Sequence, residues 1–491
     1  MPKSILISPF SQIKDSSPAL GVAYLAAMLE KEGCIVKILS PFTEYQNLSV
    51  EDIKKEIQFF SPDFIGISLY TQNVLFSYRM LKELKKLKIP IVAGGYHPSI
   101  VPHEVLDNNV DIVVRGEGEE TIVDLLKYFS GKINIKDIPG ISYKDKSGDC
   151  CDNPDRPPIV DLDSISFPAK YLYENDDHVK HKRDYRKFGR LITSRGCPMN
   201  CTYCCNRLLH KYRCRSPHNV LEEILFIKQR YDIIDFLFFD ALFTPANPEN
   251  IITLCDLIIQ ERLKIKWRCT ARLEFVTPEL LFKMKEAGCY LVNYGIQSSN
   301  PQTLKRIKRH TDIGFIKQVL KWTKDAGIKA DVDFMWGFPW ESKDDISKNI
   351  EFLKEIYPYI NLIMMEGIVL PFPGTELYEN YKDQYGFEEW WLNPAKQYDY
   401  NPYLYQSISF KDGLLSDPIF NYSLAIKKEI KKAARYITKN NMKNYSFKRK
   451  LVFIIIIRIS KLLSRIAPSI EINLFQPVLF KIRYIFKRPI F

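Results

Sequence analysis

The chain has 491 residues, of which 46% are hydrophobic and 26% charged, a composition that excludes a disordered protein. Its formal net charge of +12 is concentrated in residues 424–491, which hold 17 Lys and Arg against two Glu. Residues 1–423 are therefore close to neutral, and this charge does not support a nucleic-acid-binding groove in the main domains. We expect no nucleic-acid partner.

Residues 1–135 alternate short apolar runs with amphipathic segments, a pattern typical of a parallel sheet covered by helices on both faces. Strands are predicted at residues 4–7, 35–39, 64–69, 91–93 and 112–114, and helices at residues 21–31, 50–59, 74–87 and 119–129. Such sheets bind ligands at the carboxyl ends of their strands. These ends carry small, hydroxyl-bearing or acidic residues, namely Ser68, Thr71, Gly94, Gly95, Gly116 and Glu117. Plain turn chemistry is the alternative interpretation of the glycines.

Residues 136–187 are rich in proline and polar side chains, which predicts a solvated linker. A second alternating series then begins. Strands are predicted at residues 191–193, 236–239, 266–270, 290–294, 330–334 and 362–365, with helices at 219–231, 248–262, 278–287, 313–326 and 343–356. Six parallel strands with helical crossovers form a partial barrel whose active face is at the carboxyl ends of the strands.

Three cysteines, Cys197, Cys201 and Cys204, follow the first of these strands at spacings of four and three residues. Structural zinc needs four ligands, usually from two separated pairs, and the chain has no second pair with that spacing. A cubane iron–sulfur cluster normally takes four cysteines, so three of them leave one iron open to another ligand. The spacing therefore favours a cluster with one open iron.

Eight short motifs appear in a fixed order along residues 1–375. They are PALGVAYLAA at 18–27, PDFIGIS at 62–68, GGYHP at 94–98, RGEGE at 115–119, SRGCPMNCTYC at 194–204, GIQS at 295–298, GFP at 337–339 and PFPGT at 371–375. With these motifs the chain resembles the cobalamin-binding radical S-adenosylmethionine enzymes, and among them the methyltransferases.

The resemblance implies an α/β protein of two cofactor-binding domains and an extension. We expect a Rossmann-like cobalamin-binding domain at 1–135, a linker at 136–187 and a partial (β/α)6 TIM-type barrel at 188–375. A helical C-terminal extension would follow, with a cap at 376–445 and a basic amphipathic tail at 446–491.

The resemblance also implies the cofactors. Cys197, Cys201 and Cys204 would ligate a four-iron four-sulfur cluster whose open iron chelates S-adenosylmethionine. An electron from the cluster would break a sulfur–carbon bond of this ligand and produce a 5′-deoxyadenosyl radical. The expected contacts to S-adenosylmethionine are Tyr203, Asp240, Arg272, Gln297, Ser298, Gly337 and Pro339, and those to cobalamin are Gly21, Ser68, Thr71, Gly94, Gly95, Gly116 and Glu117.

Several of these positions have a second interpretation. Tyr203 is either a neighbour of the adenine or a packing residue, and Arg272 is either a carboxylate clamp or an ion-pair partner. Gln297 stands where the family often has glutamate, and Trp340 where it usually has glycine. The histidine loop that supplies a cobalt ligand in methionine-synthase-like domains is missing, so His97 and His103 are predicted to be structural.

The remaining cysteines are predicted to be structural, because free cysteine is among the residue types most often buried. Cys205 adjoins Cys204, and adjacent side chains rarely reach one cluster from an extended loop. The other cysteines in the barrel segment are Cys214, Cys255, Cys269 and Cys289.

The resemblance implies methylation of an unactivated carbon. A cobalamin-dependent oxidation, cyclisation or rearrangement and a non-catalytic scaffold are the alternatives. An external electron donor such as flavodoxin or ferredoxin is expected.

Residues 451–467 read as an apolar helix with a basic stripe. Its uninterrupted apolar run, residues 451–457, is too short to span a bilayer, whereas the helix is suited to a membrane surface. We therefore expect a lipid or secondary-metabolite substrate and peripheral membrane contact, docking of the helix on the protein itself being the alternative. The first residues lack the apolar core of a signal peptide, and the 11 cysteines show no disulfide pattern, which predicts a cytoplasmic protein.

Overall fold

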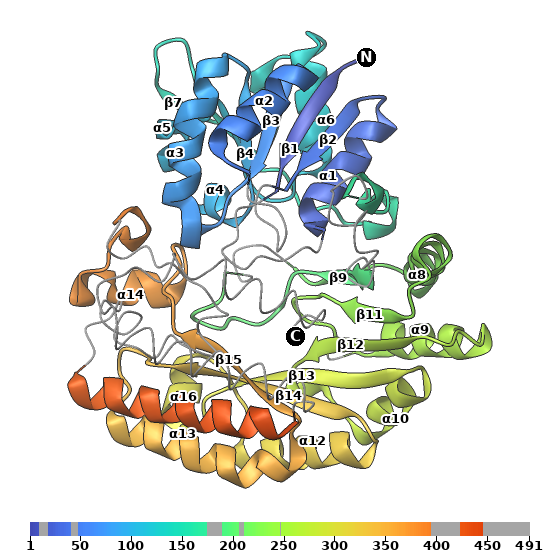
Figure 1. The fold of residues 1–491 in the computed structure, drawn as a ribbon, viewed down its shortest axis with the longest axis vertical. Helices are drawn as coiled ribbons and strands as arrows, with labels where there is room; N and C mark the ends of the chain where they lie inside the picture. Colours follow the sequence, from blue (N-terminus) through green and yellow to red (C-terminus); the bar gives the residue numbers. More distant parts are fainter. Residues whose placement is uncertain are drawn as a thin grey trace, which may run out of the picture.

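The computed structural model describes residues 1–8, 18–40, 48–173, 189–205, 211–245, 247–393 and 423–444. Figure 1 shows a twisted sheet with flanking helices at the top and a curved layer of strands and helices below it. Between these two layers lies the short strand β9 (Ser194–Arg195), which immediately precedes the first cysteine of the three-cysteine motif.

The N-terminal sheet contains the five predicted parallel strands. They are β1 (Lys3–Ile7), β2 (Ile35–Leu39), β3 (Phe64–Ser68), β4 (Ile91–Gly94) and β5 (Ile112–Val114). The strand order β2-β1-β3-β4-β5 reverses direction between β1 and β3. The carboxyl ends of these two strands therefore border the crevice in which open α/β sheets bind their ligands.

Four predicted helices cover this sheet. They are α1 (Leu20–Lys31), α2 (Val50–Phe60), α3 (Val74–Leu84) and α6 (Glu119–Phe129). Apolar side chains of α1 and α6 pack on one face of the sheet, and those of α2 and α3 pack on the other. Two short helices that the sequence did not predict, α4 (Tyr96–Ile100) and α5 (Pro102–Asp107), follow β4.

The expected solvated linker is partly folded into the sheet. The strands β6 (Ile141–Lys144) and β7 (Cys150–Asp152) extend the sheet beyond β5 with antiparallel pairing. Ile141 and Tyr143 are buried, so a short apolar alternation is present between the prolines. The prolines that predicted a linker flank this hairpin rather than interrupt it, since none lies within β6 or β7.

The second sheet contains six parallel strands in the order β15-β14-β13-β12-β11-β8, as expected of a partial barrel. They are β8 (Arg190–Leu191), β11 (Asp235–Phe238), β12 (Lys266–Ala271), β13 (Cys289–Gln297), β14 (Lys329–Trp336) and β15 (Leu362–Ile368). The helices between them are α8 (Pro217–Tyr231), α9 (Glu249–Gln260), α10 (Pro278–Glu286), α11 (Pro301–Arg306), α12 (Ile313–Asp325) and α13 (Lys343–Ile356). Of these helices, α11 was not predicted. A short strand β10 (Arg213–Cys214) pairs with β9.

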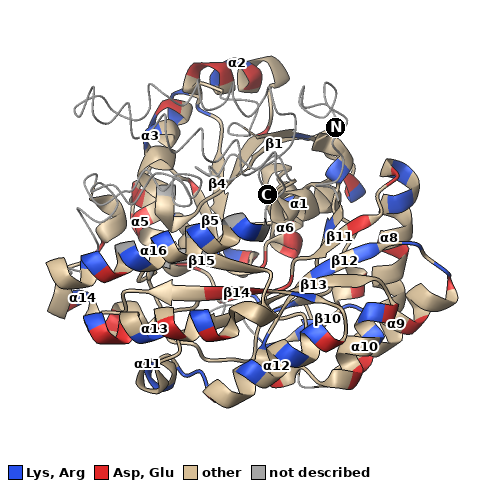
Figure 2. Cartoon of the chain, turned by 60° about the horizontal axis from the view of Figure 1, so that its bottom comes forward, with Lys and Arg blue, Asp and Glu red and all other residues tan. Residues whose placement is uncertain are grey.

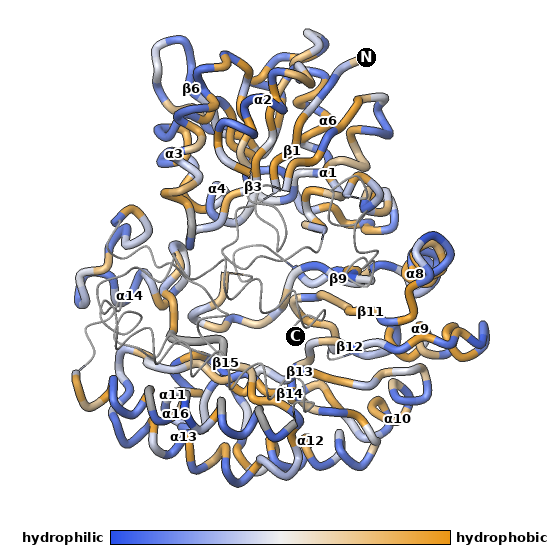
Figure 3. Tube along the Cα trace, in the orientation of Figure 1, coloured by the Kyte–Doolittle hydropathy of each residue, from blue (hydrophilic) through white to orange (hydrophobic). Residues whose placement is uncertain are grey.

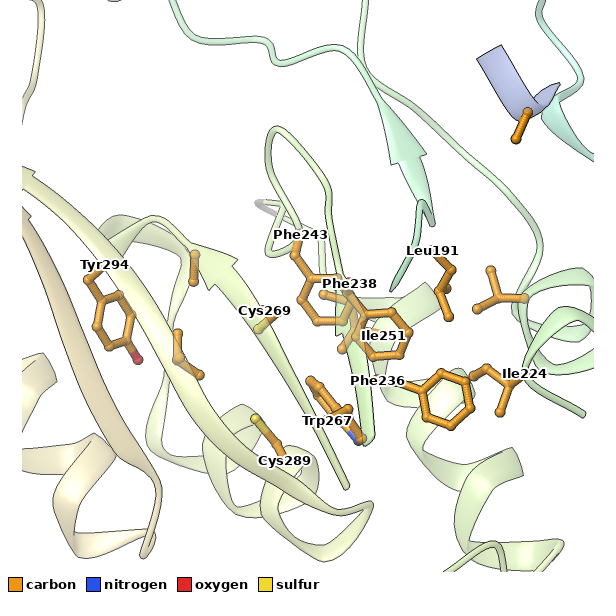
Figure 4. Close-up of a cluster of buried hydrophobic side chains, with 14 of the residues drawn as sticks. Leu191, Ile224, Phe236, Phe238, Phe243, Ile251, Trp267, Cys269, Cys289 and Tyr294 are labelled. Atoms are coloured by element: carbon orange, nitrogen blue, oxygen red, sulfur yellow. The ribbon is translucent and has the colours of Figure 1, made fainter. Parts of the chain in front are cut away.

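An aromatic cluster fills the space between β11, β12 and their helices, as Figure 4 shows. The rings of Phe238 and Phe243 stack at 4.9 Å between centroids, and Trp267 lies at 4.9 Å from Phe238. The Trp267 indole donates a hydrogen bond to the Ala287 carbonyl at 2.8 Å, so its one polar atom is satisfied in the core. The colouring of Figure 3 shows hydrophobic residues along the strands of both layers.

After β15 the chain adds α14 (Glu376–Tyr385), a short 3-10 helix, η10 (Trp390–Leu392), and α16 (Leu424–Asn444). Helix α16 packs on α13 and β15 through Ile430, Ala433 and Ile437. The predicted tail at 446–491 lies outside the described residues. Among the helices that are described, none combines the length and the hydropathy of a membrane span.

Substitution of Gly288 tests the contact at the start of β13. Gly288 has φ +98°, and a Cβ would lie 2.3 Å from the Ile265 carbonyl oxygen, so backbone must move. We expect Gly288→Ala to cost roughly 3 kcal/mol in free energy of unfolding. Gly131→Ala is the control, because Gly131 also has positive φ but open space around its Cβ, and should cost only about 1 kcal/mol. Equal thermal melting midpoints for the two variants would contradict the predicted clash.

Candidate active site

The three-cysteine loop is fixed by contacts from distant parts of the barrel. The Cys204 amide donates to the Cys201 carbonyl at 3.2 Å, which makes a tight turn. Between them, the Thr202 amide donates to the Ile307 carbonyl at 3.4 Å, and the Thr202 carbonyl accepts from the Leu377 amide at 2.8 Å. The cysteine loop, which follows β8, is thus held by the segments that follow β13 and β15.

Positive charge lies beside the thiols. The Arg272 guanidinium, which is 7% exposed, donates to Cys201 Sγ at 3.4 Å and to Glu274 at 2.7 Å. Burial raises the pKa of the Cys197 thiol, while the charges of Arg272 and Arg309 act in the opposite direction. Of the two interpretations of Arg272, the ion pair is therefore present in the structure, and the same side chain also contacts a cysteine.

The strand before the loop is tied to the N-terminal sheet by buried charges. Arg195 donates to Glu117 at 3.2 Å and to Glu119, and its guanidinium lies 5.3 Å from the ring centre of Tyr24. Arg213 donates to both carboxylate oxygens of Glu117, at 2.8 and 2.9 Å. Burial would raise the pKa of Glu117, but hydrogen bonds from Arg213 and the charge of Arg195 lower it to about 2.

This arrangement changes the interpretation of Glu117, for which we expected a cobalamin contact. Both oxygens of its carboxylate are bound by arginines of the barrel layer and by the Ile159 amide, at 2.8 Å. Its observed contacts thus join the two layers. The sequence signal was ambiguous, because a Gly-Glu-Gly turn at a strand end suits either role.

Asp240 follows β11 and anchors the end of the first barrel strand. Its Oδ1 atom accepts hydrogen bonds from the Thr193 amide at 2.8 Å and from the Ser194 hydroxyl at 2.8 Å. Its Oδ2 atom is buried without a partner among the described residues. Burial raises the pKa of Asp240 to about 6 despite these hydrogen bonds. One carboxylate oxygen therefore stabilises the loop, and the other has no partner among the described residues.

Gln297 lies at the end of β13, where the pairing with β14 shifts register. It has φ +72°, a left-handed conformation that is uncommon for a residue with a side chain. Its Oε1 atom is buried and unpaired within the described ranges. A Cβ at Gly295 would lie 2.5 Å from Gln297 Nε2 and 2.7 Å from Arg309, so Gly295 makes room for both side chains.

Ser298 is fully buried next to Gln297, in a polar network that fixes the start of α11. Its hydroxyl donates to Asn349 Oδ1 at 3.3 Å and accepts from the Asn300 amide at 3.1 Å. These contacts give Ser298 a part in shaping the end of β13.

The segment after β14 forms a turn around a buried carboxylate. Glu341 Oε2 accepts from the amides of Gly337 and Phe338 at 3.0 and 3.1 Å, and its Oε1 has no partner among the residues described. Burial raises the pKa of Glu341 to about 8, although these amide hydrogen bonds lower it. The Pro339 carbonyl accepts from the Tyr385 hydroxyl at 3.1 Å.

Tyr203, in the cysteine loop, packs against the turn that follows β14. Its ring lies 6.3 Å from that of Phe338 in an edge-to-face arrangement. The packing interpretation of Tyr203 is thus observed, and its expected position near an adenine remains a prediction.

The carboxyl edge of the N-terminal sheet contains most of the predicted cobalamin contacts. Ser68 and Gly94 end neighbouring strands, and a Cβ at Gly95 (φ +108°) would lie 3.1 Å from Ser68 Oγ. Gly116 also has positive φ, and its amide donates to the Ser99 hydroxyl at 3.0 Å. Gly21 lies exposed on α1, and a Cβ at this position would have open space around it.

Thr71 differs from these residues because its hydroxyl has a partner in the protein. It contacts His97 Nδ1 at 3.1 Å, and the other ring nitrogen of His97 lies 3.3 Å from the Tyr78 hydroxyl and 3.2 Å from Glu104. His97 is 0% exposed, as its predicted structural role requires. Glu104 also accepts from the Trp391 indole at 2.8 Å, which connects this network to η10.

Tyr96 brings the two layers together at the cysteine loop. It begins α4, and burial raises its pKa, with the neighbouring Cys204 and Cys205 acting in the same direction. Tyr96, which follows the carboxyl end of β4, therefore lies near the last cysteine of the motif.

The residues present fit a cluster with a polar organic ligand. In the part of the chain that is described, no three ligand side chains converge on one point as around a single metal ion. The thiolates of a cubane bind separate irons and need no such convergence. Several buried polar atoms of the barrel layer have no partner among the described residues, including Thr202 Oγ1, Asp240 Oδ2, Asn293 Oδ1, Gln297 Oε1, Arg309 Nε and Glu341 Oε1. Such atoms cost free energy unless a ligand satisfies them.

Arg309, Asn293 and Glu341 were missed in the sequence. Arg309 lies in the run Lys305–His310, which has the composition of a solvated surface, yet its side chain is buried. Asn293 lies inside a predicted strand, and Glu341 resembles a helix-start residue before α13. Local pattern could not distinguish these positions, because their burial depends on strands that are far apart in sequence.

Three other cysteines are buried beneath the barrel strands, as expected of structural residues. Burial raises the pKa of Cys269 well above its usual value, with Cys289 acting in the same direction, and Figure 4 shows both in the core. Cys255 is also buried. Cys214 is half-buried on β10.

Comparisons with known proteins agree with this geometry. Residues 10–126 match the B12 binding domain family, and residues 191–353 match the radical SAM superfamily. An uncharacterized methyltransferase of Pyrococcus horikoshii is 34% identical over 371 residues, which cover 74% of this chain and 78% of that protein. The anaerobic magnesium-protoporphyrin IX monomethyl ester cyclase of Rubrivivax gelatinosus is 25% identical, over 76% and 68% of the two chains.

Among solved structures, a similar fold is found in the radical S-adenosylmethionine methyltransferase TsrM from Kitasatospora setae, with cobalamin and a [4Fe-4S] cluster bound. The TM-score is 0.65 at 18% identity, covering 78% of this chain and 75% of that one. The likeness thus extends over both layers.

The Glu341 carboxyl gives a pH-dependent contribution to stability. Its folded pKa of about 8 lies above the ordinary value of 4.5, so the folded protein binds a proton that the unfolded chain has lost. The contribution is complete below pH 4.5 and declines as pH rises toward 8, by up to about 1.4 kcal/mol per unit. We expect Glu341→Gln to gain stability relative to the wild type between pH 6 and pH 8, measured as thermal melting.

Glu222→Gln, at an exposed position on α8, is the control for loss of a carboxylate and should show a constant difference from the wild type. A constant difference for Glu341→Gln as well would contradict the raised pKa.

Proposed function

Because the chain belongs to the cobalamin-binding radical S-adenosylmethionine enzymes, we propose that it methylates an unactivated carbon of a small molecule or lipid. The cofactors of the family are a four-iron four-sulfur cluster, S-adenosylmethionine and cobalamin. When bound, the cluster supplies the electron that cleaves S-adenosylmethionine to the 5′-deoxyadenosyl radical, and cobalamin carries the methyl group.

We assign the cluster to Cys197, Cys201 and Cys204. The observation that supports this most is the fixed loop that carries them, with a guanidinium at 3.4 Å from Cys201 Sγ. Arg272 would stabilise the negative charge of thiolates and sulfides, because a buried charge of opposite sign favours the ionised form. Thr202, held by two distant backbone segments, would keep the loop open in the shape that a cluster requires.

We assign S-adenosylmethionine to the unpaired polar atoms on the barrel side of this loop. Asp240 Oδ2, Gln297 Oε1 and Arg309 Nε can each satisfy a hydrogen-bond requirement of a ligand with amino, carboxylate and ribose groups. Gly337 and Pro339 would offer backbone at the same mouth, with the turn held by Glu341. Cobalamin would then contact the sheet edge formed by Ser68, Gly94 and Gly95.

A second reaction class keeps the same cofactors. The similar cyclase from Rubrivivax gelatinosus shows that proteins with related sequences form rings. In such a reaction the radical would remove hydrogen, and no methyl group would reach the product. The similar P. horikoshii protein and TsrM, both described as methyltransferases, favour the first reaction.

We further propose that the protein acts at the inner surface of a membrane on a lipid-soluble substrate. Helix α16 supports this, since Lys428, Lys432, Arg435, Lys439 and Lys443 are exposed at helical spacing along one side. Its opposite side is buried on the barrel, so the basic side chains face outward. The sequence that follows is also basic and apolar, a composition suited to anionic headgroups.

Loss of a cluster ligand tests the radical assignment. We expect protein reconstituted anaerobically with iron, sulfide and cobalamin to form 5′-deoxyadenosine from S-adenosylmethionine and dithionite, measured by chromatography. Cys201→Ala should lower the yield at least about 1,000-fold, because the loss of a ligand removes the bound metal and its chemistry. Cys205→Ala, the adjacent thiol, is the matched control and should retain activity. An undiminished yield from Cys201→Ala would refute the assignment.

The products distinguish the two reactions. Methyl transfer should give S-adenosylhomocysteine alongside 5′-deoxyadenosine and a product heavier by one methylene unit, measured by mass spectrometry. 5′-Deoxyadenosine without S-adenosylhomocysteine would favour oxidation or cyclisation.

Vesicle binding tests the membrane proposal. The full chain should sediment with phosphatidylglycerol vesicles and not with phosphatidylcholine vesicles, and 0.5 M salt should release it because charge attraction is screened. Reversal of Lys428, Lys439 and Lys443 to Glu should weaken binding about tenfold or more, at roughly 1 kcal/mol per basic residue. Unchanged binding in this variant would exclude α16 from the contact.

A further inference from the structure

A basic surface lies directly outside the three-cysteine loop, on α11 and the turn that follows it. Residues 301–311 contain four Lys and Arg and no Asp or Glu. Lys305, Arg306 and Lys308 are exposed, whereas Arg309 is buried toward the loop. Lys308 pairs with Glu376 at 2.7 Å, but neither Lys305 nor Arg306 has an acidic partner in the described part of the chain. We call the exposed pair Lys305 and Arg306 the α11 surface; Trp340 lies beneath it.

The α11 surface is coupled to the loop through backbone. The Ile307 carbonyl, one residue beyond α11, accepts from the amide of Thr202, which lies between Cys201 and Cys204. The first residues of α14 hold the same Thr202 from the other side, through Leu377. Figures 2 and 3 show α11 and α14 on one side of the molecule. The α11 surface is thus joined to the cysteine loop by the Thr202–Ile307 backbone hydrogen bond.

Aromatic rings form a second connection between the loop and this surface. Tyr203, beside Cys204, packs against Phe338, and Phe338 stacks on Trp340 at 5.2 Å between ring centroids. The Arg306 guanidinium lies 5.3 Å from the centre of the Trp340 ring, and the Trp340 indole donates to Thr303 at 3.1 Å. Trp340, which replaces the glycine common in the family, therefore fills the space between the buried turn and the exposed α11.

We propose that the α11 surface docks an acidic one-electron carrier protein, which reduces the cluster. The proposal rests on the proposed function, because cleavage of S-adenosylmethionine consumes one electron. The carrier, a reduced flavin or iron–sulfur protein, loses one electron and the cluster gains it, with no bond formed or broken between the proteins. Opposite charges on the two surfaces would steer the encounter, as in other weak electron-transfer complexes.

A second basic surface, on α16, is less suited to this role at its C-terminal half. This half carries the exposed Lys439 and Lys443 and lies against the start of β15, where Asn441 bonds with the backbone of Ile363. The cysteine loop contacts the segment beyond the other end of β15, through Leu377. Electron transfer slows steeply with distance, so a carrier bound there would be poorly placed. Helix α16 therefore provides a matched control of equal charge.

The test compares two double charge reversals in the full-length reconstituted enzyme. Lys305→Glu/Arg306→Glu alters the α11 surface, and Lys439→Glu/Lys443→Glu changes net charge by the same amount at the C-terminal half of α16. Stopped-flow absorbance would follow reduction of the cluster by reduced flavodoxin, and calorimetry would give the dissociation constant of the complex. Dithionite, a small reductant that needs no docking surface, would be used in parallel.

We expect the α11 variant to be reduced by flavodoxin about tenfold or more slowly than the wild type, with a weaker complex. The difference should shrink in 0.5 M salt, and the α16 variant should stay within about twofold. Equal losses in both variants, or no loss in the α11 variant, would overturn the proposal. Absence of 5′-deoxyadenosine from the wild type with dithionite would instead overturn the proposed function.

Substitution of Trp340 distinguishes binding of the carrier from the rate of electron transfer to the cluster. Trp340→Leu should slow reduction by flavodoxin while leaving the dissociation constant and the reaction with dithionite unchanged, and Trp340→Phe should restore most of the rate. If Trp340→Leu reacts with flavodoxin as fast as the wild type does, the aromatic connection has no part in reduction.

Discussion

The pairing of Arg195 with Glu117 and Glu119 is the constraint on which the arrangement of the two layers depends. A guanidinium two residues before Cys197 is largely buried between the two layers, and carboxylates of the N-terminal layer compensate its charge there. Removing one partner from a buried pair costs about 3–5 kcal/mol. Because Glu117 and Glu119 belong to the N-terminal layer, at the start of α6, docking of that layer supplies the compensating charges. Arg213 adds a second cation to Glu117 and strengthens the connection.

The polar groups at the barrel mouth, in contrast to the paired charges of Arg195 and Glu117, are not compensated by partners in the described chain. There, buried oxygen and nitrogen atoms of Asp240, Gln297, Arg309 and Glu341 lack partners in the described chain, at about 1–3 kcal/mol each. The left-handed backbone of Gln297 and the raised pKa of Glu341 add strain at the same place. A protein retains such costs where a ligand satisfies the groups. The unpaired groups are the ones to which we assign S-adenosylmethionine, whereas the paired charges of Arg195 and Arg213 join the two layers.

Much of the fold could be predicted because its elements carry strong local patterns. The alternation of β-branched runs with amphipathic segments identified eleven parallel strands and nine of the helices between them. The hairpin of β6 and β7 was missed because flanking prolines resembled a linker, although Ile141 and Tyr143 alternate with polar residues. Helix α11 was missed because it is only six residues long and has little apolar periodicity. The order of the strands in the N-terminal sheet was not predicted, because it depends on long-range pairing.

The sequence by itself determined the chemistry that this chain can host. The spacing of Cys197, Cys201 and Cys204 and the ordered motifs indicate the cofactors, since ligand type and spacing are local properties of the chain. Only the tertiary structure decided what Glu117, Arg309 and Trp340 contact. Glu117 meets arginines about 80 and 100 residues away, Arg309 turns inward from a basic run, and Trp340 bridges a buried turn and an exposed helix. The physical reason is that burial and charge compensation depend on long-range packing, which no local pattern of residues records.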